Sequence, residues 1–349
     1  MKVYLLSDML KSIEKSGVGR ALDHQKMALQ KADIPYTTGQ EGRVKDYDLI
    51  HINTIFPQSL LKACWARLRG KTVVYHAHST EEDFRDSFKL ANALAPLFKL
   101  WLKICYNSGH LIVTPSAYSK SLLDQYQLKA PIQVISNGID LDYWQASQEE
   151  IQAFKARYQA DPTRPLIISV GLPIKRKGII DFVELAKDLP DYDFVWFGHT
   201  DIRFLPKEVQ QAYYTKLDNL KFAGYIDRKD IRVAYAACDI YLFLTHEETE
   251  GIVLLEALAS KANTIVRDIP VFNKDFHHGQ NVYKGQNLEE FKSLIQDLVQ
   301  ENIPSLTQAG YQAAAAKSID QVGHQLKLAY QEAMDLADNK PGLLSKKAN

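Results

Sequence analysis

The strongest constraint on the fold is a succession of short apolar runs, each followed by a helical pattern, which occurs twice in the 349 residues. In the first half the runs stand at 2–6, 49–53, 72–77, 111–114 and 132–135. Continuous apolar strands separated by helices are typical of a parallel sheet that helices cover on both faces. The pattern restarts after the middle of the chain. The sequence therefore predicts an α/β protein with two doubly wound halves.

A polar segment at 142–165, rich in turn-forming residues, reads as the linker between the halves. We expect an N-terminal domain over 1–145 and a C-terminal domain over 146–318. A helix near 319–336 needs an apolar surface, and we expect it to dock back on the N-terminal domain. The tail at 337–349 is expected to be flexible.

Charge and cysteine content exclude several classes of protein. The 42 Lys and Arg residues balance 42 Asp and Glu residues, which argues against a nucleic-acid partner. The three cysteines stand far apart without a CxxC motif, which predicts no disulfide framework and indicates a reducing cytoplasm. No signal-peptide pattern is seen, and no apolar stretch approaches the roughly 18 residues needed to cross a bilayer. Any membrane contact is expected to be peripheral.

Two strand-to-helix junctions carry features that suit phosphate groups. Gly17 and Gly19 would let a backbone approach a ligand closely at the start of a helix, and Arg176 and Lys177 precede the matching helix of the second half. A tight turn is an equally good interpretation of the glycines, since the spacing is not GxGxxG. A solvated basic turn is the alternative for the cations.

Two carboxylates stand eight residues apart near the start of a later helix. Glu248 precedes Gly251, and Glu256 follows among Leu254, Leu255 and Leu258. A carboxylate on so apolar a helix is costly unless it is hydrogen-bonded, and ribose hydroxyls are a usual partner in nucleotide sites. An exposed position on the outer helix face is the alternative.

Two histidines follow the strand at 72–77. His76 and His78 are expected to point to the same side, but no third ligand supports a zinc site. A histidine at the mouth of a strand is a candidate for hydrogen-bonding a substrate, and we assign that role to His78. His76 is interpreted as a core histidine.

Together these motifs resemble the retaining glycosyltransferases of family 4. The resemblance rests on the EX7E spacing of Glu248 and Glu256, on Val170-Gly171 followed by Lys177-Gly178, on the sequence Ser-Asn-Gly-Ile-Asp at 136–140, and on the glycine loop. It covers nearly the whole chain. It implies a GT-B fold, in which two Rossmann-like doubly wound domains face each other across a cleft.

The resemblance also implies roles for individual residues. His78, Lys177 and Glu248 would be catalytic, with His78 near the anomeric centre and Lys177 on the diphosphate. The family usually has Arg where Leu172 stands, and Arg176 is the candidate replacement. Residues implied to bind the donor are Gly17, Gly19, Arg176, Lys177, Glu248, Thr249, Glu250, Gly251, Ile252, Val253 and Glu256. No metal and no cofactor are expected beyond UDP-glucose or UDP-galactose as the donor substrate.

A narrower resemblance is to lactic-acid-bacterial enzymes that add a second hexose to monoglucosyl-diacylglycerol. It rests on Glu14–Ala21, His51-Ile52-Asn53, His76–Arg85 and Lys175–Ile179. It implies transfer of galactose or glucose, a glycolipid acceptor, and a diglycosyl-diacylglycerol product that serves as a membrane lipid and lipoteichoic-acid anchor. The expected location is the inner face of the cell membrane.

The N-terminal half has features that suit an anionic membrane surface. No acidic residue occurs in 49–80 or in 87–123, and helical spacing there combines cations with apolar side chains. We expect membrane or acceptor contacts from Lys62, Arg67, Arg69, Phe98, Lys99, Trp101 and Lys103. The alternative is that this apolar stripe packs on the sheet of the N-terminal domain.

Three other functions stay open on the sequence alone. A family 4 enzyme could act on a polysaccharide or protein acceptor, a GT-B-like epimerase would need no lipid, and a partner subunit would bind without catalysis. The cationic N-terminal half argues against the epimerase, and the intact candidate site residues argue against the subunit.

Overall fold

The computed structural model describes residues 1–6, 16–39, 46–158, 161 and 163–338. They form two compact units. Unit 1 comprises 1–81, 94–138 and 317–349, and unit 2 comprises 82–93 and 139–316. The chain passes from unit 1 into the main part of unit 2 between residues 138 and 139 and returns to unit 1 between residues 316 and 317. Most of the tail at 337–349 is outside the described residues.

Unit 1 is built on a parallel sheet with the strand order β2-β1-β3-β4-β5-β6. The strands are β1 (Val3–Leu6), β2 (Tyr36–Thr38), β3 (Leu49–Ile52), β4 (Thr72–His76), β5 (Leu111–Thr114) and β6 (Ile132–Val134). The helices are α2 (Gly17–Lys31), α3 (Pro57–Leu68), α4 (Glu81–Phe84, at the boundary with unit 2), α5 (Ala91–Tyr106), α6 (Ala117–Asp124) and α14 (Ile319–Asp338).

The apolar strands of unit 1 serve two separate cores because alternate side chains point to opposite faces of a sheet. Val3 and Leu5 of β1 pack with α2 and α14, whereas Tyr4 and Leu6 pack with α3 and α5. Helices therefore cover both faces, as the continuous apolar runs predict.

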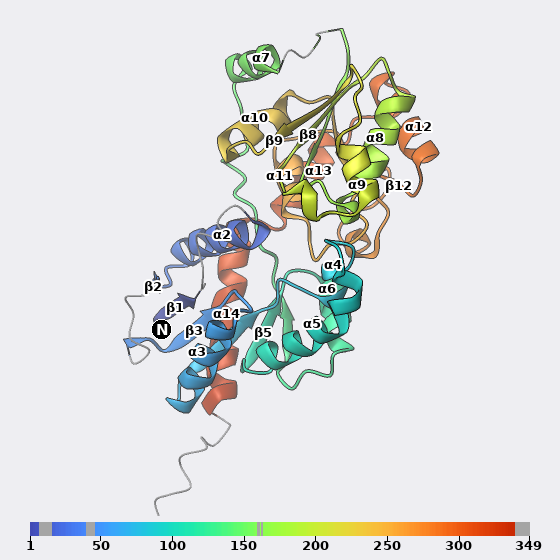
Figure 1. The fold of residues 1–349 in the computed structure, drawn as a ribbon. Coiled ribbons are helices and arrows are strands. Elements are labelled where there is room, and N and C mark those ends of the chain that lie inside the picture. The colour runs from blue at the N-terminus through green and yellow to red at the C-terminus, as the bar shows by residue number, and fades with distance from the viewer. Residues whose placement is uncertain (7–15, 40–45, 159–160, 162, 339–349) are drawn as a thin grey trace, which may run out of the picture. The chain divides into compact units, whose positions relative to one another are not determined.

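Helix α14 completes unit 1, although it is the last helix of the described chain. It lies beside α2 on one face of the sheet (Figure 1). The contact is close at Gly323, where an added Cβ would lie 2.4 Å from the backbone oxygen of Ala28. A side chain at this position would force the two helices apart.

Unit 2 repeats the design with the strand order β12-β11-β10-β7-β8-β9. Its strands are β7 (Leu166–Val170), β8 (Asp193–Phe197), β9 (Leu220–Gly224), β10 (Ile240–Phe243), β11 (Thr264–Arg267) and β12 (Tyr283–Gly285). Its helices are α7 (Gln148–Arg157), α8 (Ile179–Asp188), α9 (Lys207–Tyr213), α10 (Arg228–Ala237), α11 (Ile252–Ala259), α12 (Leu288–Val299) and α13 (Thr307–Ala315).

The segment at 142–165, interpreted from the sequence as a polar linker, contains helix α7. Helix α7 begins there with a capping box, in which the Ser147 hydroxyl accepts from the backbone N–H of Glu150 (3.2 Å) and the Glu150 carboxylate accepts from that of Ser147 (2.9 Å). This S-x-x-E signature was present in the sequence. It was missed because the helix buries little apolar surface, chiefly Phe154.

Replacing Gly323 by Ala should lower the free energy of unfolding by about 1–3 kcal/mol, because the new methyl group overlaps the backbone of α2. Urea unfolding followed by circular dichroism measures the change. Gly17→Ala is the matched control: nothing lies within 4 Å of its added Cβ, so its unfolding midpoint should stay close to that of the wild type. Equal midpoints for both variants would contradict the close packing of α14 on α2.

Candidate functional site

In unit 2 the candidate residues lie at the carboxyl ends of β7 and β10, which are neighbours in the sheet. Gly178, with φ +82°, lets the connection after β7 touch the one after β10, since an added Cβ would lie 2.4 Å from the Leu244 carbonyl oxygen. The backbone N–H of His246 donates to the Arg176 carbonyl at 2.7 Å. Residues distant in sequence are thereby held together at the edge where open α/β sheets bind ligands.

Lys177 and Glu248 form an ion pair in this position. Only 16% of the Lys177 side chain and 9% of the Glu248 side chain are exposed to solvent. Burial lowers the pKa of the Lys177 ammonium, although the Glu248 carboxylate acts in the opposite direction. The sequence-based hypothesis named both residues but not their pairing.

Arg176 is held by a second carboxylate, which the sequence analysis did not single out. Its Nη1 lies 2.8 Å from Oδ1 of Asp83 and also donates to the Glu247 carbonyl at 2.8 Å. Burial raises the pKa of Asp83 and the nearby Glu248 adds to this, while Arg176 and Lys177 oppose it. Two cations thus face two carboxylates, and an anionic ligand would have to take the place of these internal partners.

The start of α11 offers backbone N–H groups next to this cluster. Its N-cap is Gly251, with φ +88°, and no side chain caps the helix. The first N–H groups of an uncapped helix and the positive end of its dipole attract anions. Contact of residues 249–253 with the donor stays a prediction.

Glu256 is fully buried on α11 and accepts a hydrogen bond from the hydroxyl of Tyr235 at 3.3 Å. The alternative of an exposed glutamate on the outer helix face was therefore wrong. The sequence indicated that a carboxylate on this apolar helix needs a hydrogen-bond donor, and the Tyr235 hydroxyl is such a donor. A role in holding ribose stays a prediction.

In unit 1 the glycine loop leads into α2, which begins at Gly17. Ser16 caps the helix and its hydroxyl accepts from the backbone N–H of Gly19 at 3.3 Å. The turn into a helix is thus confirmed, whereas contact of the glycines with a diphosphate stays a prediction. Residues 14 and 15 of the expected loop lie outside the described residues.

His78 lies just beyond β4, with its ring stacked on that of His76 at a centroid distance of 3.9 Å. His76 is buried, as a core histidine should be. Burial lowers the pKa of His78 to about 3, so the ring is neutral near pH 7. Its Nε2 lies 3.1 Å from the Oδ1 of Asn53, which follows the neighbouring strand β3.

The structure corrects part of the expected membrane set. Arg67 donates to the carbonyls of residues 107–109, and Lys99 pairs with Glu81 at 3.0 Å. Phe98 and Trp101 pack against the core, and the Trp101 indole N–H donates to the Ile55 carbonyl at 2.7 Å. These four side chains are engaged within unit 1.

A different set of apolar side chains is exposed on α3 and α5. Its members are Leu61, Trp65, Leu68, Leu94, Leu97, Leu100 and Ile104, here called the exposed apolar face. The two helices are neighbours, because they share one core and Arg67 of α3 reaches the carbonyls that follow α5. The spacing of apolar residues in the sequence could not show which side of α5 is buried, because both sides carry apolar residues.

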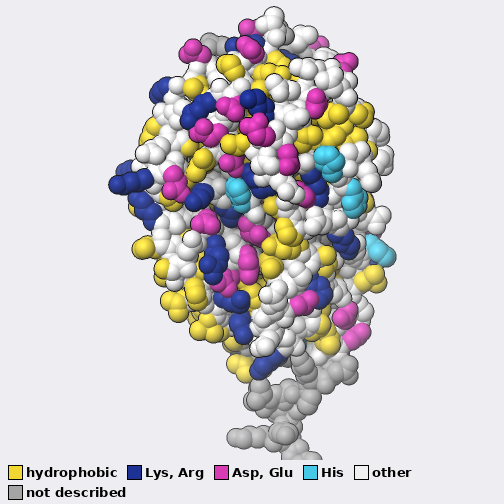
Figure 2. Space-filling model, turned by 90° about the vertical axis from the view of Figure 1, so that its right-hand side faces the viewer, with side chains coloured by type: hydrophobic (Ala, Val, Ile, Leu, Met, Phe, Trp, Pro, Cys, Tyr) yellow, Lys and Arg dark blue, Asp and Glu magenta, His cyan; other side chains and the backbone are white. Residues whose placement is uncertain are grey.

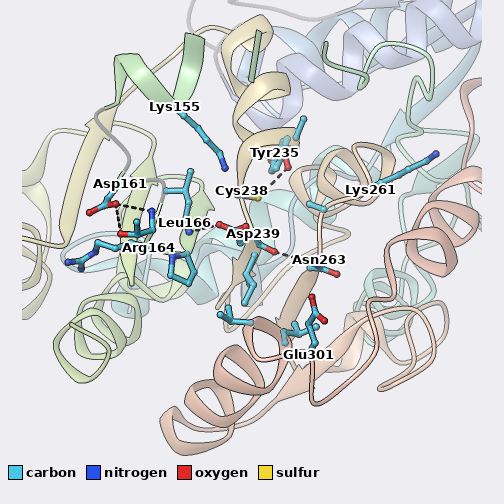
Figure 3. Close-up of a pocket in the computed structure, with 17 residues that line it drawn as sticks. Lys155, Asp161, Arg164, Leu166, Tyr235, Cys238, Asp239, Lys261, Asn263 and Glu301 are labelled. Atoms are coloured by element: carbon cyan, nitrogen blue, oxygen red, sulfur yellow. Dashed lines mark hydrogen bonds between the residues drawn. The ribbon is translucent and has the colours of Figure 1, made fainter. Parts of the chain in front are cut away.

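A cavity of about 450 Å³ in unit 2 lies elsewhere (Figure 3). It is lined by residues at the amino ends of three strands, among them Leu166, Asp239 and Asn263. It therefore lies at the opposite end of the sheet from Lys177 and Glu248. Within the described ranges no group of three or more His, Cys, Asp or Glu residues could hold a metal ion.

The two parallel six-stranded sheets, each covered by helices, match solved structures of the GT-B fold. Anabaena HepE, solved in complex with UDP-glucose, superposes with a TM-score of 0.76 at 17% identity over 95% of this chain and all of that one. Sucrose-phosphate synthase from Thermosynechococcus elongatus gives 0.76 at 15% identity, with 96% and 99% covered.

Sequence comparison then gives the family. Residues 30–143 match the model for Glycosyltransferase Family 4, and 150–316 match that for Glycosyl transferases group 1. The processive diacylglycerol alpha-glucosyltransferase of Acholeplasma laidlawii is 38% identical over 338 residues, which cover 96% of this chain and 99% of that protein. The alpha-galactosylglucosyldiacylglycerol synthase of Streptococcus pneumoniae is 25% identical, with 84% and 80% covered. The chain belongs to the family 4, group 1 glycosyltransferases.

Removing one partner of the buried ion pair should destabilise unit 2. Lys177→Met leaves the Glu248 carboxylate buried without its cation, which typically costs about 3–5 kcal/mol. The double variant Lys177→Met, Glu248→Leu should recover most of this loss, because it removes both charges. Urea unfolding of the two variants and the wild type measures the effect. A single variant as stable as the wild type would show that the pair is not desolvated.

Proposed function

We propose that the enzyme transfers a hexose from a UDP-sugar to monoglucosyl-diacylglycerol, with retention at the anomeric carbon, and forms a diglycosyl-diacylglycerol. The observation that carries this proposal is the 38% identity, across nearly the full length of both chains, to a processive diacylglycerol alpha-glucosyltransferase. A processive enzyme must accept a lipid that already bears a sugar. The pneumococcal relative is likewise named for a diglycosyl lipid.

The charged cluster of unit 2 suits the diphosphate of the donor. Lys177 would exchange the Glu248 carboxylate for phosphate oxygens, and the open start of α11 would donate backbone N–H groups. Arg176, fixed by Asp83 at 2.8 Å, would supply the second cation in place of the arginine that Leu172 replaces. Glu248, once released, would be available to the hydroxyls of the donor sugar.

In the transfer step the bond between the anomeric carbon and the diphosphate oxygen breaks as the acceptor hydroxyl attacks from the same face. The departing phosphate oxygen takes the proton of that hydroxyl, so the products are a glycosidic bond and UDP. Lys177 and Arg176 stabilise the negative charge that develops on the leaving group. This route needs no carboxylate nucleophile and no metal ion.

Of the two candidate donors, we favour UDP-glucose. The relative that transfers glucose is 38% identical over 96% of the chain, while the relative named for a galactosyl product is 25% identical over 84%. UDP-galactose is the alternative donor.

The exposed apolar face of α3 and α5 suits an acceptor that lies in a bilayer. Cations at Lys62, Arg69 and Lys103 accompany it, and 49–80 contain no acidic residue. Apolar insertion and attraction to anionic lipids together favour peripheral binding at the inner face of the membrane. No helix of the described ranges has the length and hydropathy to span a bilayer. On the face shown in Figure 2, Lys and Arg side chains are interspersed with Asp and Glu side chains.

The proposed reaction is tested with purified enzyme, UDP-glucose or UDP-galactose, and vesicles that hold diacylglycerol or monoglucosyl-diacylglycerol. New diglycosyl lipid should form with the glucosylated acceptor. Glu248→Ala and Lys177→Ala should each reduce the rate at least 100-fold, since they remove groups at the reacting diphosphate and sugar. Lys187→Ala, an exposed position on α8, is the control and should keep the wild-type rate.

Other outcomes would change the assignment. Binding of UDP without any lipid product would move the acceptor to a polysaccharide or protein. Near-normal rates in Glu248→Ala or Lys177→Ala would overturn the assignment of the site.

Binding to vesicles should depend on the exposed apolar face. Leu97 lies on α5 and is 66% exposed. Leu97→Asp places a negative charge on this face and should weaken binding to phosphatidylcholine–phosphatidylglycerol vesicles about tenfold or more. Leu328→Asp changes a leucine that is 60% exposed on α14 and should bind as the wild type does. Vesicle sedimentation measures both. Equal binding of both variants would contradict this surface as the membrane contact.

A further inference from the structure

Behind His78 a chain of hydrogen bonds runs into the interior of unit 1. The Nε2 of His78 lies 3.1 Å from Oδ1 of Asn53, whose Nδ2 donates to Oε1 of Gln25 at 2.9 Å. The Nε2 of Gln25 lies 2.9 Å from Nδ1 of His51. All three residues are buried: His51 lies on β3, Asn53 directly follows that strand, and Gln25 lies on α2.

His51 joins this chain to two further buried groups. Its Nδ1 lies 2.8 Å from the hydroxyl of Tyr330 on α14, and its Nε2 lies 3.3 Å from Nδ1 of His76. The ring of His76 in turn stacks on that of His78. The network therefore returns to the histidine from which it began.

The proton positions in this network depend on one another. Because the Asn53 amide donates to Gln25, its oxygen faces His78, and Nε2 of His78 must carry the proton. Because Gln25 donates to Nδ1 of His51, the proton of His51 is on Nε2, where it is donated to His76. His76 then carries its own proton on Nε2. Reversing both amides would move all three protons to Nδ1, so the rings share one tautomer in either arrangement.

The surroundings keep the three rings neutral. Burial lowers the pKa of His51 and His78 to about 3 and that of His76 well below its usual value. His78 adds to the lowering of the pKa at both His51 and His76. Tyr330 is the other titratable group in contact with them, and burial raises its pKa. Among the described residues no carboxylate, lysine or arginine makes a hydrogen bond or ion pair with these rings. The Nδ1 of His78 also has no hydrogen-bond partner within the described ranges.

We propose that Asn53, Gln25, His51 and Tyr330 are positioning residues, which hold His78 neutral with its proton on Nε2 and present its Nδ1 as an acceptor to a hydroxyl of the sugar substrate. The contact with the sugar rests on the proposed function, but the shared tautomer does not. A neutral ring suits the reaction because positive charge develops at the anomeric carbon, and an imidazolium beside it would oppose that charge. His78 is thus a hydrogen-bonding group in this reaction and neither its acid nor its base.

The tautomers can be observed directly. Protein labelled with ¹⁵N in its histidine rings gives two-bond ¹H–¹⁵N spectra that distinguish the Nε2–H, Nδ1–H and doubly protonated forms. Signals of His51, His76 and His78 are assigned by their loss in single His→Gln variants. All three should show the Nε2–H pattern at pH 7 and keep it down to pH 5. The Nδ1–H pattern at His78, different tautomers among the three rings, or protonation of any of them above pH 6 would overturn the proposal.

The link to catalysis is tested with Gln25→Glu. The new carboxylate faces Nδ1 of His51 and can only accept there, so Nδ1 must carry a proton. Its negative charge also favours the imidazolium over a neutral ring with its proton moved to Nδ1, so His51 should become doubly protonated and positively charged near neutral pH. The pH profile of kcat should then acquire an acid limb between pH 5 and 8 that the wild type lacks. Gln30→Glu makes the same change at an exposed position of α2 and should keep the wild-type profile.

The outcomes separate the two proposals. A Gln25→Glu profile identical to the wild type would show that the network does not act on His78 and would overturn the positioning role. A wild-type enzyme that transfers no sugar to lipid would contradict the proposed function and, with it, the sugar contact. The ¹⁵N spectra of the wild type would still decide the shared tautomer.

Discussion

The buried ion pair of Lys177 and Glu248 is the interaction on which the arrangement of unit 2 depends. It joins the connections that follow two adjacent strands, and Gly178 makes their approach possible by leaving room for the carbonyl of Leu244. In low dielectric surroundings each charge requires the other. The pair thus keeps a cation at the strand ends. Its two members are 71 positions apart in the sequence and are brought together only by the fold.

The two units use buried polar groups in different ways. Unit 2 holds full charges in opposite pairs, which an anion can enter by exchange with a carboxylate. Unit 1 holds neutral rings and amides that are joined by hydrogen bonds and by the stacking of His76 on His78. Among the described residues, Nε2 of His76 and Nδ1 of His78 have no hydrogen-bond partner. A transferase needs both kinds of group: charge at the departing diphosphate, and uncharged contacts where the sugar becomes positive.

Much of the fold and part of the site could be predicted from the sequence. Continuous apolar strands indicated two doubly wound sheets, and the EX7E spacing pointed to Glu248 and Glu256. The pairing of Arg176 with Asp83 could not be predicted, because it joins segments that only the tertiary fold brings together. The buried side of α5 was assigned wrongly, with Phe98 and Trp101 turned outward. Apolar residues lie on both the buried and the exposed side of this helix, so their spacing does not show which side packs on the sheet.

Helix α14 closes the first core of the molecule with residues from the end of the described chain. Val322, Leu326 and Tyr330 pack against strands and a helix that were synthesised about 190 to 330 residues earlier. On the ribosome, unit 2 therefore has all of its strands and helices before unit 1 has its last helix. The histidine network, which includes Tyr330, is also incomplete until then, so the two halves of the enzyme mature in the reverse of their order in the gene.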